Sequence, residues 1–304
     1  DLIASLETDS VPTNNNVNIL AVQKYTDVLS RIPPLSGKKS RKFKNASAAF
    51  NIAYTPENGR YAVAKSTCKV GDVIINELCY SSIISSEFLL QYCDNCMVRV
   101  EAPYPCRNCA GVVYCGKTCE ETAWNLFHKW ECQHMIWLDV AWQGKLGHLA
   151  LRSVLKVNWL EKKDFFFKDP PTSVSMECGF NADGSYPGDY SSVFNLVTNR
   201  TSRAPDNVLL LCLIAALLCK IAESSGYLDH IVHLLRSTDS TVDRKIILKH
   251  LGGLFLHHLQ VIQCNAFGIA EMVGNDDFRT FRPRDIGMGL YATTSLINHS
   301  CNPN

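Results

Sequence analysis

Eight side chains that bind metal ions well lie close together in the first half of the chain. The segment from 93 to 132 reads CDNCMVRVEAPYPCRNCAGVVYCGKTCEETAWNLFHKWEC and holds two C-x2-C pairs, one C-x3-C pair and one H-x3-C pair. Such short spacings let a tight turn bring both ligand atoms of a pair to one ion. Eight ligands fill two tetrahedral Zn2+ sites with no open position, which predicts structural rather than catalytic zinc. The ligands are Cys93, Cys96, Cys106, Cys109, Cys115, Cys119, His128 and Cys132.

A chance cluster of reduced cysteines is the alternative, but four correctly spaced pairs argue against it. A segment this short buries little apolar surface, so bound metal would supply much of its folding free energy. The chain has fourteen cysteines, and its start, DLIASLETDS, shows no signal peptide. We therefore expect a reducing compartment, in which clustered cysteines hold metal more often than they form disulfides.

The composition describes a globular chain. Of 304 residues, 46% are hydrophobic and 19% are charged, and the net charge is +1, which allows more than one core. A pI near 7.6 gives no overall attraction to nucleic acid. The longest apolar run, VLLLCLIAALLC at 208–219, is shorter than the roughly 20 residues that cross a bilayer. It predicts a buried helix, and we expect neither nucleic acid nor membrane as a partner.

The segments around the cysteines predict an α+β fold. Residues 51–84 alternate apolar and polar residues between turn signals, which is typical of short strands. Residues 135–157, 207–226 and 242–262 carry apolar residues at helical spacing, and a loop rich in Gly, Pro, Ser and Asp spans 164–192. Strand character returns at 261–272 and from 286 onward.

Isolated residues in the helical part have plain structural interpretations. His257 and His258 are adjacent, so they point to different helix faces, and we expect one to be packed and the other exposed. Cys212 and Cys219 are seven residues apart and are expected in the core on one face. The basic stretch KKSRKFK at 38–44 predicts a solvated linker, with a nuclear-localisation signal or a patch for an acidic partner as the alternative.

The cysteine-rich segment resembles the MYND zinc finger, including Trp124 before the histidine and Lys129 and Glu131 between the last two ligands. The resemblance implies that Cys93, Cys96, Cys115 and Cys119 share one ion, and that Cys106, Cys109, His128 and Cys132 share the other. It also implies a protein-binding module, with a proline-containing peptide or a histone deacetylase complex as partner.

The last residues resemble a SET domain. GMGLYA at 287–292 is followed by a short apolar stretch and then by NHSCNPN at 298–304. Near the start, a turn at Gly59 and Arg60 also resembles a SET domain, although Tyr61 stands where the family usually has a second glycine, and an ordinary hairpin turn explains the same residues. Together with the finger, these features resemble the SET and MYND domain-containing family, in its branch with N-terminal tetratricopeptide repeats.

This resemblance implies a domain order. Residues 1–44 would be a linker or the end of an upstream helical region, and residues 45–92 the N-terminal part of the SET domain. The MYND finger would span 93–132, a helical insert 133–258, and the SET core 259–304. The family continues after NHSC with a catalytic tyrosine and a cysteine-rich segment, so the chain is expected to be cut at both ends and its SET core to be incomplete.

The resemblance also implies a reaction, the transfer of a methyl group from S-adenosylmethionine to a protein lysine. Gly59, Arg60, Asn265, Asn298 and His299 would bind the cofactor. Ser300 and Cys301 would shape the loop, and Phe267 would lie near the wall of the lysine channel, although an ordinary strand explains Phe267 nearly as well. With the catalytic tyrosine expected beyond Asn304, this chain alone is expected to transfer methyl groups poorly or not at all.

A second class of function stays open from the sequence, a zinc-binding adaptor or corepressor-type scaffold without catalysis. Tyr61 favours the adaptor, whereas NHSC favours the enzyme. Histone and non-histone substrates are equally compatible with the sequence. The expected location is the cytoplasm and the nucleus.

Overall fold

A central three-stranded antiparallel sheet joins distant parts of the chain. The computed structural model describes residues 33–140, 144–167, 175–237, 241–274 and 281–299. The sheet order is β3 (Ser81–Ile84), β7 (Phe281–Leu290) and β6 (Ala266–Gly274). A side chain at Gly287 would collide with the Ile83 carbonyl, so glycine permits the close approach of β7 to β3. The sheet thus closes across an insertion of some 180 residues between β3 and β6.

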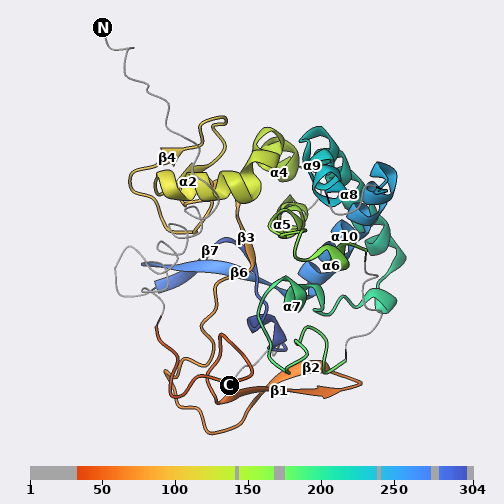
Figure 1. Ribbon diagram of the computed structural model, residues 1–304. Helices are drawn as coiled ribbons and strands as arrows, with labels where there is room; N and C mark the ends of the chain where they lie inside the picture. The colour runs from red at the N-terminus through yellow and green to blue at the C-terminus, as the bar shows by residue number, and fades with distance from the viewer. Residues whose placement is uncertain (1–32, 141–143, 168–174, 238–240, 275–280, 300–304) are drawn as a thin grey trace.

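Two smaller antiparallel sheets lie on either side of this sheet (Figure 1). The first is a hairpin of β1 (Phe50–Thr55) and β2 (Gly59–Ala64), in which Thr55 pairs with Gly59. Gly59 has a φ of +63°, a backbone conformation that favours glycine. The second pairs β4 (Tyr104–Pro105) with β5 (Val113–Tyr114) inside the cysteine-rich segment. Strand β3 is preceded at 65–80 by irregular chain that makes an isolated bridge at Ile75.

The cysteine-rich segment ends in a nearly continuous helical stretch, drawn at the upper left of Figure 1. Short segments of different pitch follow one another in this stretch, and a π-helical turn contains His128. They are α2 (Lys117–Ala123), the π-helical turn η2 (Trp124–His128), α3 (Lys129–Glu131), the 3-10 turn η3 (Cys132–His134) and α4 (Met135–Val140). A separate 3-10 turn, η1 (Ser86–Phe88), follows β3.

The remaining helices form a group beside the finger, mostly at the upper right of Figure 1. The longest, α10, contacts α5, α8 and α9 and leads directly into β6. Asp243 caps its first turn by accepting hydrogen bonds from the backbone of Lys245 and Ile246. The helices are α5 (Gly144–Leu155), α6 (Lys163–Phe167), α7 (Tyr190–Phe194), α8 (Pro205–Ser224), α9 (Tyr227–Arg236) and α10 (Arg244–Asn265), with 3-10 turns η4 (Arg200–Ser202) and η5 (Thr294–Leu296).

Mixed helices and small sheets confirm the predicted α+β class. The expectation of strand character from residue 261 was wrong by several residues, because α10 continues to Asn265 and β6 begins at Ala266. Residues 1–32 of the linker expected over 1–44 lie outside the described residues, whereas Phe43, in the basic stretch at 38–44, is buried in the core. The loop predicted over 164–192 begins with α6 and ends with α7, and residues 175–188 between them are irregular.

Helix α8 is less buried than its composition suggests. It buries Leu211, Ile214 and Leu218 but exposes Leu209 and Leu213. It is long and apolar enough to cross a membrane by length and composition, with 33% of the apolar window buried. The packed core helix of a soluble protein meets the same criterion, so the absence of a membrane partner stays a prediction.

The prediction that both cysteines of this helix lie in the core was wrong for Cys212, whereas Cys219 packs against the core. Cys212 is exposed and Cys219 is half-buried, close to Gly252 of α10. The helix is apolar on all sides, so its periodicity does not reveal which side faces α10.

The prediction for the histidine pair was also wrong, because both side chains are buried. His257 is 2% exposed and His258 is 0% exposed. Nε2 of His257 donates to the Phe194 carbonyl at 2.8 Å, and Nε2 of His258 lies 3.1 Å from the Tyr190 hydroxyl. Because neighbouring elements pack on several sides of α10, two adjacent positions are both covered.

We expect His257 to make folding stability fall between pH 7 and pH 5. Burial lowers the pKa of His257 to about 4, whereas an unfolded histidine has a pKa of about 6.5. The unfolded chain therefore binds a proton in this range that the folded protein excludes, which costs about 2 kcal/mol at pH 5. Urea unfolding of the wild type and His257→Gln at both pH values measures this cost. Gln keeps a donor for Phe194, and an equal loss of stability in both proteins would contradict the assignment.

Candidate zinc centres and candidate cofactor pocket

The first candidate zinc centre gathers Cys93, Cys96, Cys115 and Cys119, whose sulfurs all lie within 4.8 Å of one another. Sγ of Cys115 lies 3.7 Å from Sγ of Cys96 and 3.5 Å from Sγ of Cys119. The first pair is held in a tight turn, in which the backbone N–H of Met97 donates to the Cys93 carbonyl at 2.8 Å. The second pair connects the end of β5 to the first turn of α2.

The second candidate centre gathers Cys106, Cys109, His128 and Cys132 within the same limit. Sγ of Cys106 lies 3.9 Å from Sγ of Cys132, and Sγ of Cys109 lies 3.5 Å from Nε2 of His128. The π-helical turn that contains His128 widens the helix locally at this ligand. The backbone N–H of Asn108 donates to Sγ of Cys106 at 3.4 Å, an outer contact typical of metal-binding thiolates.

These donor sets fit Zn2+. Burial lowers the pKa of His128, which keeps the imidazole in the neutral form that binds metal. Hydrogen bonds from Cys93 and Cys96 lower the pKa of Cys119, while the bond to Cys119 raises that of Cys96. Four sulfurs this close cannot all ionise without a cation, and a divalent ion removes that conflict. The structure thus brings the eight predicted ligands together in two groups of four, an arrangement that supports zinc binding.

A pocket of about 350 Å3 lies at the opposite side of the sheet from the finger, between the β1–β2 turn and the end of α10. Four segments that are distant in the chain meet there. All five predicted cofactor residues are among the residues that line the pocket. Its lining residues are Asn58, Gly59, Arg60, Leu196, Val197, Cys264, Asn265, Ser295, Leu296, Ile297, Asn298 and His299.

Three of the predicted cofactor residues make hydrogen bonds within the protein, and one of them is the bond from the Asn298 amide nitrogen to the Asn58 carbonyl at 3.5 Å. The buried Arg60 guanidinium donates to the carbonyls of Cys178 and Asn195, the latter at 2.7 Å, and burial lowers its pKa. The amide nitrogen of Asn265 donates to the carbonyls of Val197 and Val261, both at 2.7 Å. Arg60 therefore shapes the wall, and Asn265 keeps its side-chain oxygen as an acceptor for a ligand.

Phe267 and Tyr61, which the sequence also singled out, are not among the residues that line this pocket. Phe267 is 37% exposed and packs edge-on against Tyr291, with 6.0 Å between the ring centroids. Tyr61 pairs with Ala53 inside the hairpin. Ser300 and Cys301 lie outside the described residues.

Comparison with known proteins shows which family of proteins this chain is similar to. Residues 93–132 match the MYND finger family. The chain is 24% identical to "Protein-lysine N-methyltransferase SMYD4" of Gallus gallus, over 93% of this chain and 44% of the relative. It is 23% identical to the protein of the same name in Danio rerio, over 85% of this chain and 38% of the relative. It is 21% identical to human "Histone-lysine N-methyltransferase SMYD1", over 81% of this chain and 40% of the relative.

These matches support the SET and MYND domain-containing family for this chain, which is similar to the SMYD4 proteins. It spans about two fifths of the length of the curated relatives that it matches. At this low identity, the relatives' names support a family of protein-lysine methyltransferases.

A buried ionic network attaches the finger of this SMYD4-like chain to its sheet. The Arg152 guanidinium on α5 binds both carboxylate oxygens of Asp94 at 3.1 Å. It also binds Glu131, with the shortest contact 2.6 Å, and the Ser82 carbonyl on β3 at 2.9 Å. Burial opposes ionisation of Glu131, yet Arg152 and His148 outweigh it and hold the pKa of Glu131 well below its usual range.

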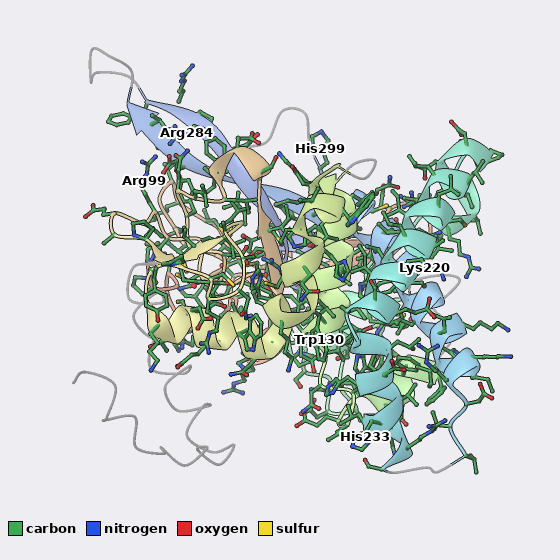
Figure 2. All side chains as sticks on the ribbon, turned by 90° about the horizontal axis from the view of Figure 1, so that it is seen from above. Arg99, Trp130, Lys220, His233, Arg284 and His299 are labelled. Carbon is green, nitrogen blue, oxygen red and sulfur yellow. The ribbon has the colours of Figure 1, made fainter. Side chains whose placement is uncertain are left out.

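A second, exposed contact joins the finger to the β6–β7 ribbon. Arg99 and Arg284 both donate to the Glu271 carboxylate, and the Arg99 contact measures 2.9 Å (Figure 2). Because these side chains are partly open to solvent, the contact contributes less than the buried network.

Several residues of the candidate sites could not be found by sequence reasoning. Leu196 and Val197 follow α7 in an irregular segment and carry no motif, although they line the cofactor pocket. Cys264 lines it too, and only its position next to Asn265 could have suggested this. Asp94 and Glu131 stand next to zinc ligands in the sequence, which is the one available signal for their role.

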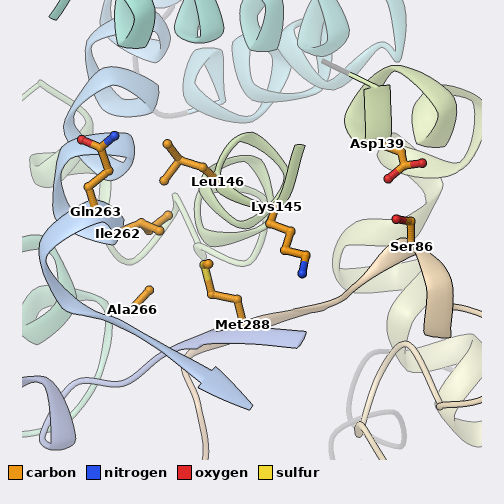
Figure 3. Close-up of a pocket in the computed structure, with 8 residues that line it drawn as sticks. All are labelled: Ser86, Asp139, Lys145, Leu146, Ile262, Gln263, Ala266 and Met288. Carbon is orange, nitrogen blue, oxygen red and sulfur yellow. The ribbon is translucent and has the colours of Figure 1, made fainter. Parts of the chain in front are cut away.

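A larger cavity of about 570 Å3 lies between α5, the end of α10 and the sheet (Figure 3). Leu146, Ile262 and Met288 provide apolar lining, and Lys145 and Asp139 stand on one side. Met288 belongs to the GMGLYA stretch, but none of the predicted cofactor residues lines this cavity.

We expect the protein to hold two zinc ions per chain, and Cys119→Ser to hold one. Structural zinc supplies on the order of 10 kcal/mol of folding free energy in isolated fingers, so this variant should also melt at a lower temperature. Metal analysis after dialysis measures the stoichiometry. Cys212→Ser, at an exposed cysteine on α8, is the matched control and should keep both ions. Two ions in Cys119→Ser would contradict the ligand assignment.

We expect Arg152→Met to lower the free energy of unfolding by about 3–5 kcal/mol, because Asp94 and Glu131 stay buried without their cation. Urea unfolding with zinc in excess measures the loss. Lys220→Met is the control, since Lys220 is 79% exposed and pairs with Glu223, and it should cost less than about 1 kcal/mol. Similar losses in the two variants would show that the network does not hold the finger.

Proposed function

We propose that the protein is an S-adenosylmethionine-dependent protein-lysine methyltransferase that carries a protein-binding MYND finger. The observation that supports this most is the convergence of Gly59, Asn265, Asn298 and His299 on one pocket. These residues come from three separate segments, each of which the resemblance to a SET domain associates with cofactor binding. The methyltransferase names of the relatives point the same way.

The pocket suits a ligand of cofactor size. Its volume of about 350 Å3 is in the range of small-molecule sites, which runs from ~300 to ~1,000 Å3. Gly59 lines the pocket and has a positive φ. A Cβ built at this position would stand in open space, with no atom within 4 Å, and glycine leaves that space to a ligand. The side-chain oxygen of Asn265 would accept a hydrogen bond, and Asn298 and His299 would form the part of the wall next to the hairpin turn, where Asn298 contacts Asn58.

When bound, S-adenosylmethionine supplies a methyl group on an activated sulfonium, so the protein needs no strong acid. Its residues must instead align the lysine amine with that group and exclude water. Phe267 and Tyr291, packed edge-on beside the pocket-forming segments, would provide an apolar wall for a lysine side chain. Such a wall disfavours the charged amine and so lowers the lysine pKa. Histone and non-histone lysines both remain candidate substrates.

A specific observation on the finger favours protein binding as a second function. Tyr104 of β4 is 41% exposed and Leu126 is 38% exposed. Among the described residues, β4 pairs only with β5, so its other edge can add an extended peptide. A proline-containing segment, as part of a deacetylase complex or another partner, is the ligand that we propose. Cytoplasm and nucleus are the proposed locations.

Equilibrium binding of S-adenosylmethionine to the zinc-loaded full-length protein tests the enzyme proposal. We expect one site, with affinity at least tenfold weaker in the double variant Asn298→Ala/His299→Ala, because both side chains belong to the pocket wall. His233→Ala is the matched control, since His233 is exposed on α9 and lies far from His299 (Figure 2).

The zinc content distinguishes the two functions. Absence of cofactor binding in a wild-type protein that holds two zinc ions would reject the enzyme and leave the adaptor function. Equal affinity in the wild type and the double variant would reject the pocket as the cofactor site.

A further inference from the structure

The Glu77 carboxylate lies beside the segment that leads into the cofactor pocket. Its Oε1 accepts from the backbone N–H of Thr293 at 2.8 Å. Its Oε2 accepts from the N–H of Thr293 at 3.0 Å, from the N–H of Thr294 at 2.8 Å and from the Thr294 hydroxyl at 2.9 Å. One side chain therefore fixes two consecutive peptide groups from a position more than 200 residues earlier in the chain.

The residues that Glu77 holds stand directly before the pocket wall. Ser295 to His299 line the pocket, whereas Glu77, Thr293 and Thr294 do not. Thr293 is 1% exposed, so its peptide group has little access to water as an alternative partner. The carboxylate thus sets the position from which the wall begins without touching a ligand itself.

The hydrogen bonds made by Glu77 require a carboxylate at this position. Both oxygens of Glu77 accept from N–H or O–H donors, and among the ion pairs of the described residues none includes Glu77. Its charge is therefore offset by the donors of the wall segment and not by a cation. An amide at this position would replace one acceptor oxygen by a donor that faces other donors.

Two further anchors hold the same segment, and both are neutral. The Tyr186 hydroxyl donates to the Ala292 carbonyl at 2.9 Å, and the Ser295 hydroxyl donates to the Asn265 carbonyl at 2.9 Å. Glu77 is the charged member of the three and makes the most bonds, and charge-assisted bonds are stronger than neutral ones.

We propose that Glu77 is a positioning residue that sets the wall from Ser295 to His299 for cofactor binding. This inference rests on the proposed function of the pocket. Glu77 acts through the backbone of Thr293 and Thr294, so its removal should weaken cofactor binding while the zinc centres stay intact.

The test compares Glu77→Gln with Asp72→Asn in the zinc-loaded full-length protein. Asp72 lies in the same segment before β3, and its carboxylate accepts from the backbone N–H of Lys69 at 2.7 Å, away from the pocket. Both variants lose one negative charge, so the comparison separates the contacts of Glu77 from a change in net charge. The probe is S-adenosylhomocysteine, and its dissociation constant is measured by calorimetry.

We expect Glu77→Gln to bind S-adenosylhomocysteine about tenfold more weakly than the wild type and Asp72→Asn to bind like the wild type, with two zinc ions in each. Amide hydrogen exchange over 292–299 should be faster in Glu77→Gln even without the probe, while exchange in the finger stays unchanged. Thr294→Val removes only the hydroxyl donor and serves if Glu77→Gln does not fold. It should shift both measurements in the same direction by a smaller factor.

The outcomes separate this inference from the proposed function. Wild-type affinity together with wild-type exchange in Glu77→Gln would overturn the role of Glu77 while the pocket assignment stands. Absence of binding in the wild type would overturn the proposed function, and the positioning role for a cofactor with it. Faster exchange throughout the protein would show a general loss of stability, which also contradicts a local positioning role.

Discussion

The structure depends on one buried cation, the guanidinium of Arg152. It is 1% exposed, stacks on the Phe127 ring at 4.1 Å and binds the carboxylates of Asp94 and Glu131. Burial of three charges is costly unless each is paired and hydrogen-bonded. The pairing is complete only when α5, the turn at Asp94 and the helical stretch with Glu131 meet in one arrangement. The network therefore specifies how the finger sits on the sheet more than it adds to stability.

This constraint connects the two candidate sites through the backbone. Asp94 lies between two ligands of one centre, and Glu131 lies between two ligands of the other. Arg152 also binds the carbonyl of Ser82, and the neighbouring Ser81 pairs with Leu290 at the end of β7. The segment that leaves Leu290 continues to the pocket wall. A contiguous set of contacts thus runs from the candidate zinc ligands to the pocket.

Sequence reasoning worked best where the chemistry is local. Spacings of two or three residues determine a metal-binding pair, so the grouping of Cys93 with Cys96 needs no knowledge of the fold. It failed where several neighbours surround one element, as at His258, because helical periodicity describes one face and not how many faces are covered. Arg152 could not be recognised either, since its partners are 58 and 21 residues away and nothing in α5 distinguishes it from a surface arginine.

The resemblance selected residues that the structure brings to one pocket, which no local pattern could do. Gly59 and Asn298 are separated by most of the chain, and their approach follows from the closure of β3 onto β7 across the inserted finger and helices. No periodicity contains that information, whereas a motif shared with a known fold carries it implicitly. The resemblance covers residues with a motif but not those that support them. Glu77 belongs to no motif, and its role follows only from the peptide groups that it binds in the folded protein. The contacts that support this pocket are therefore a property of the fold and not of a local pattern.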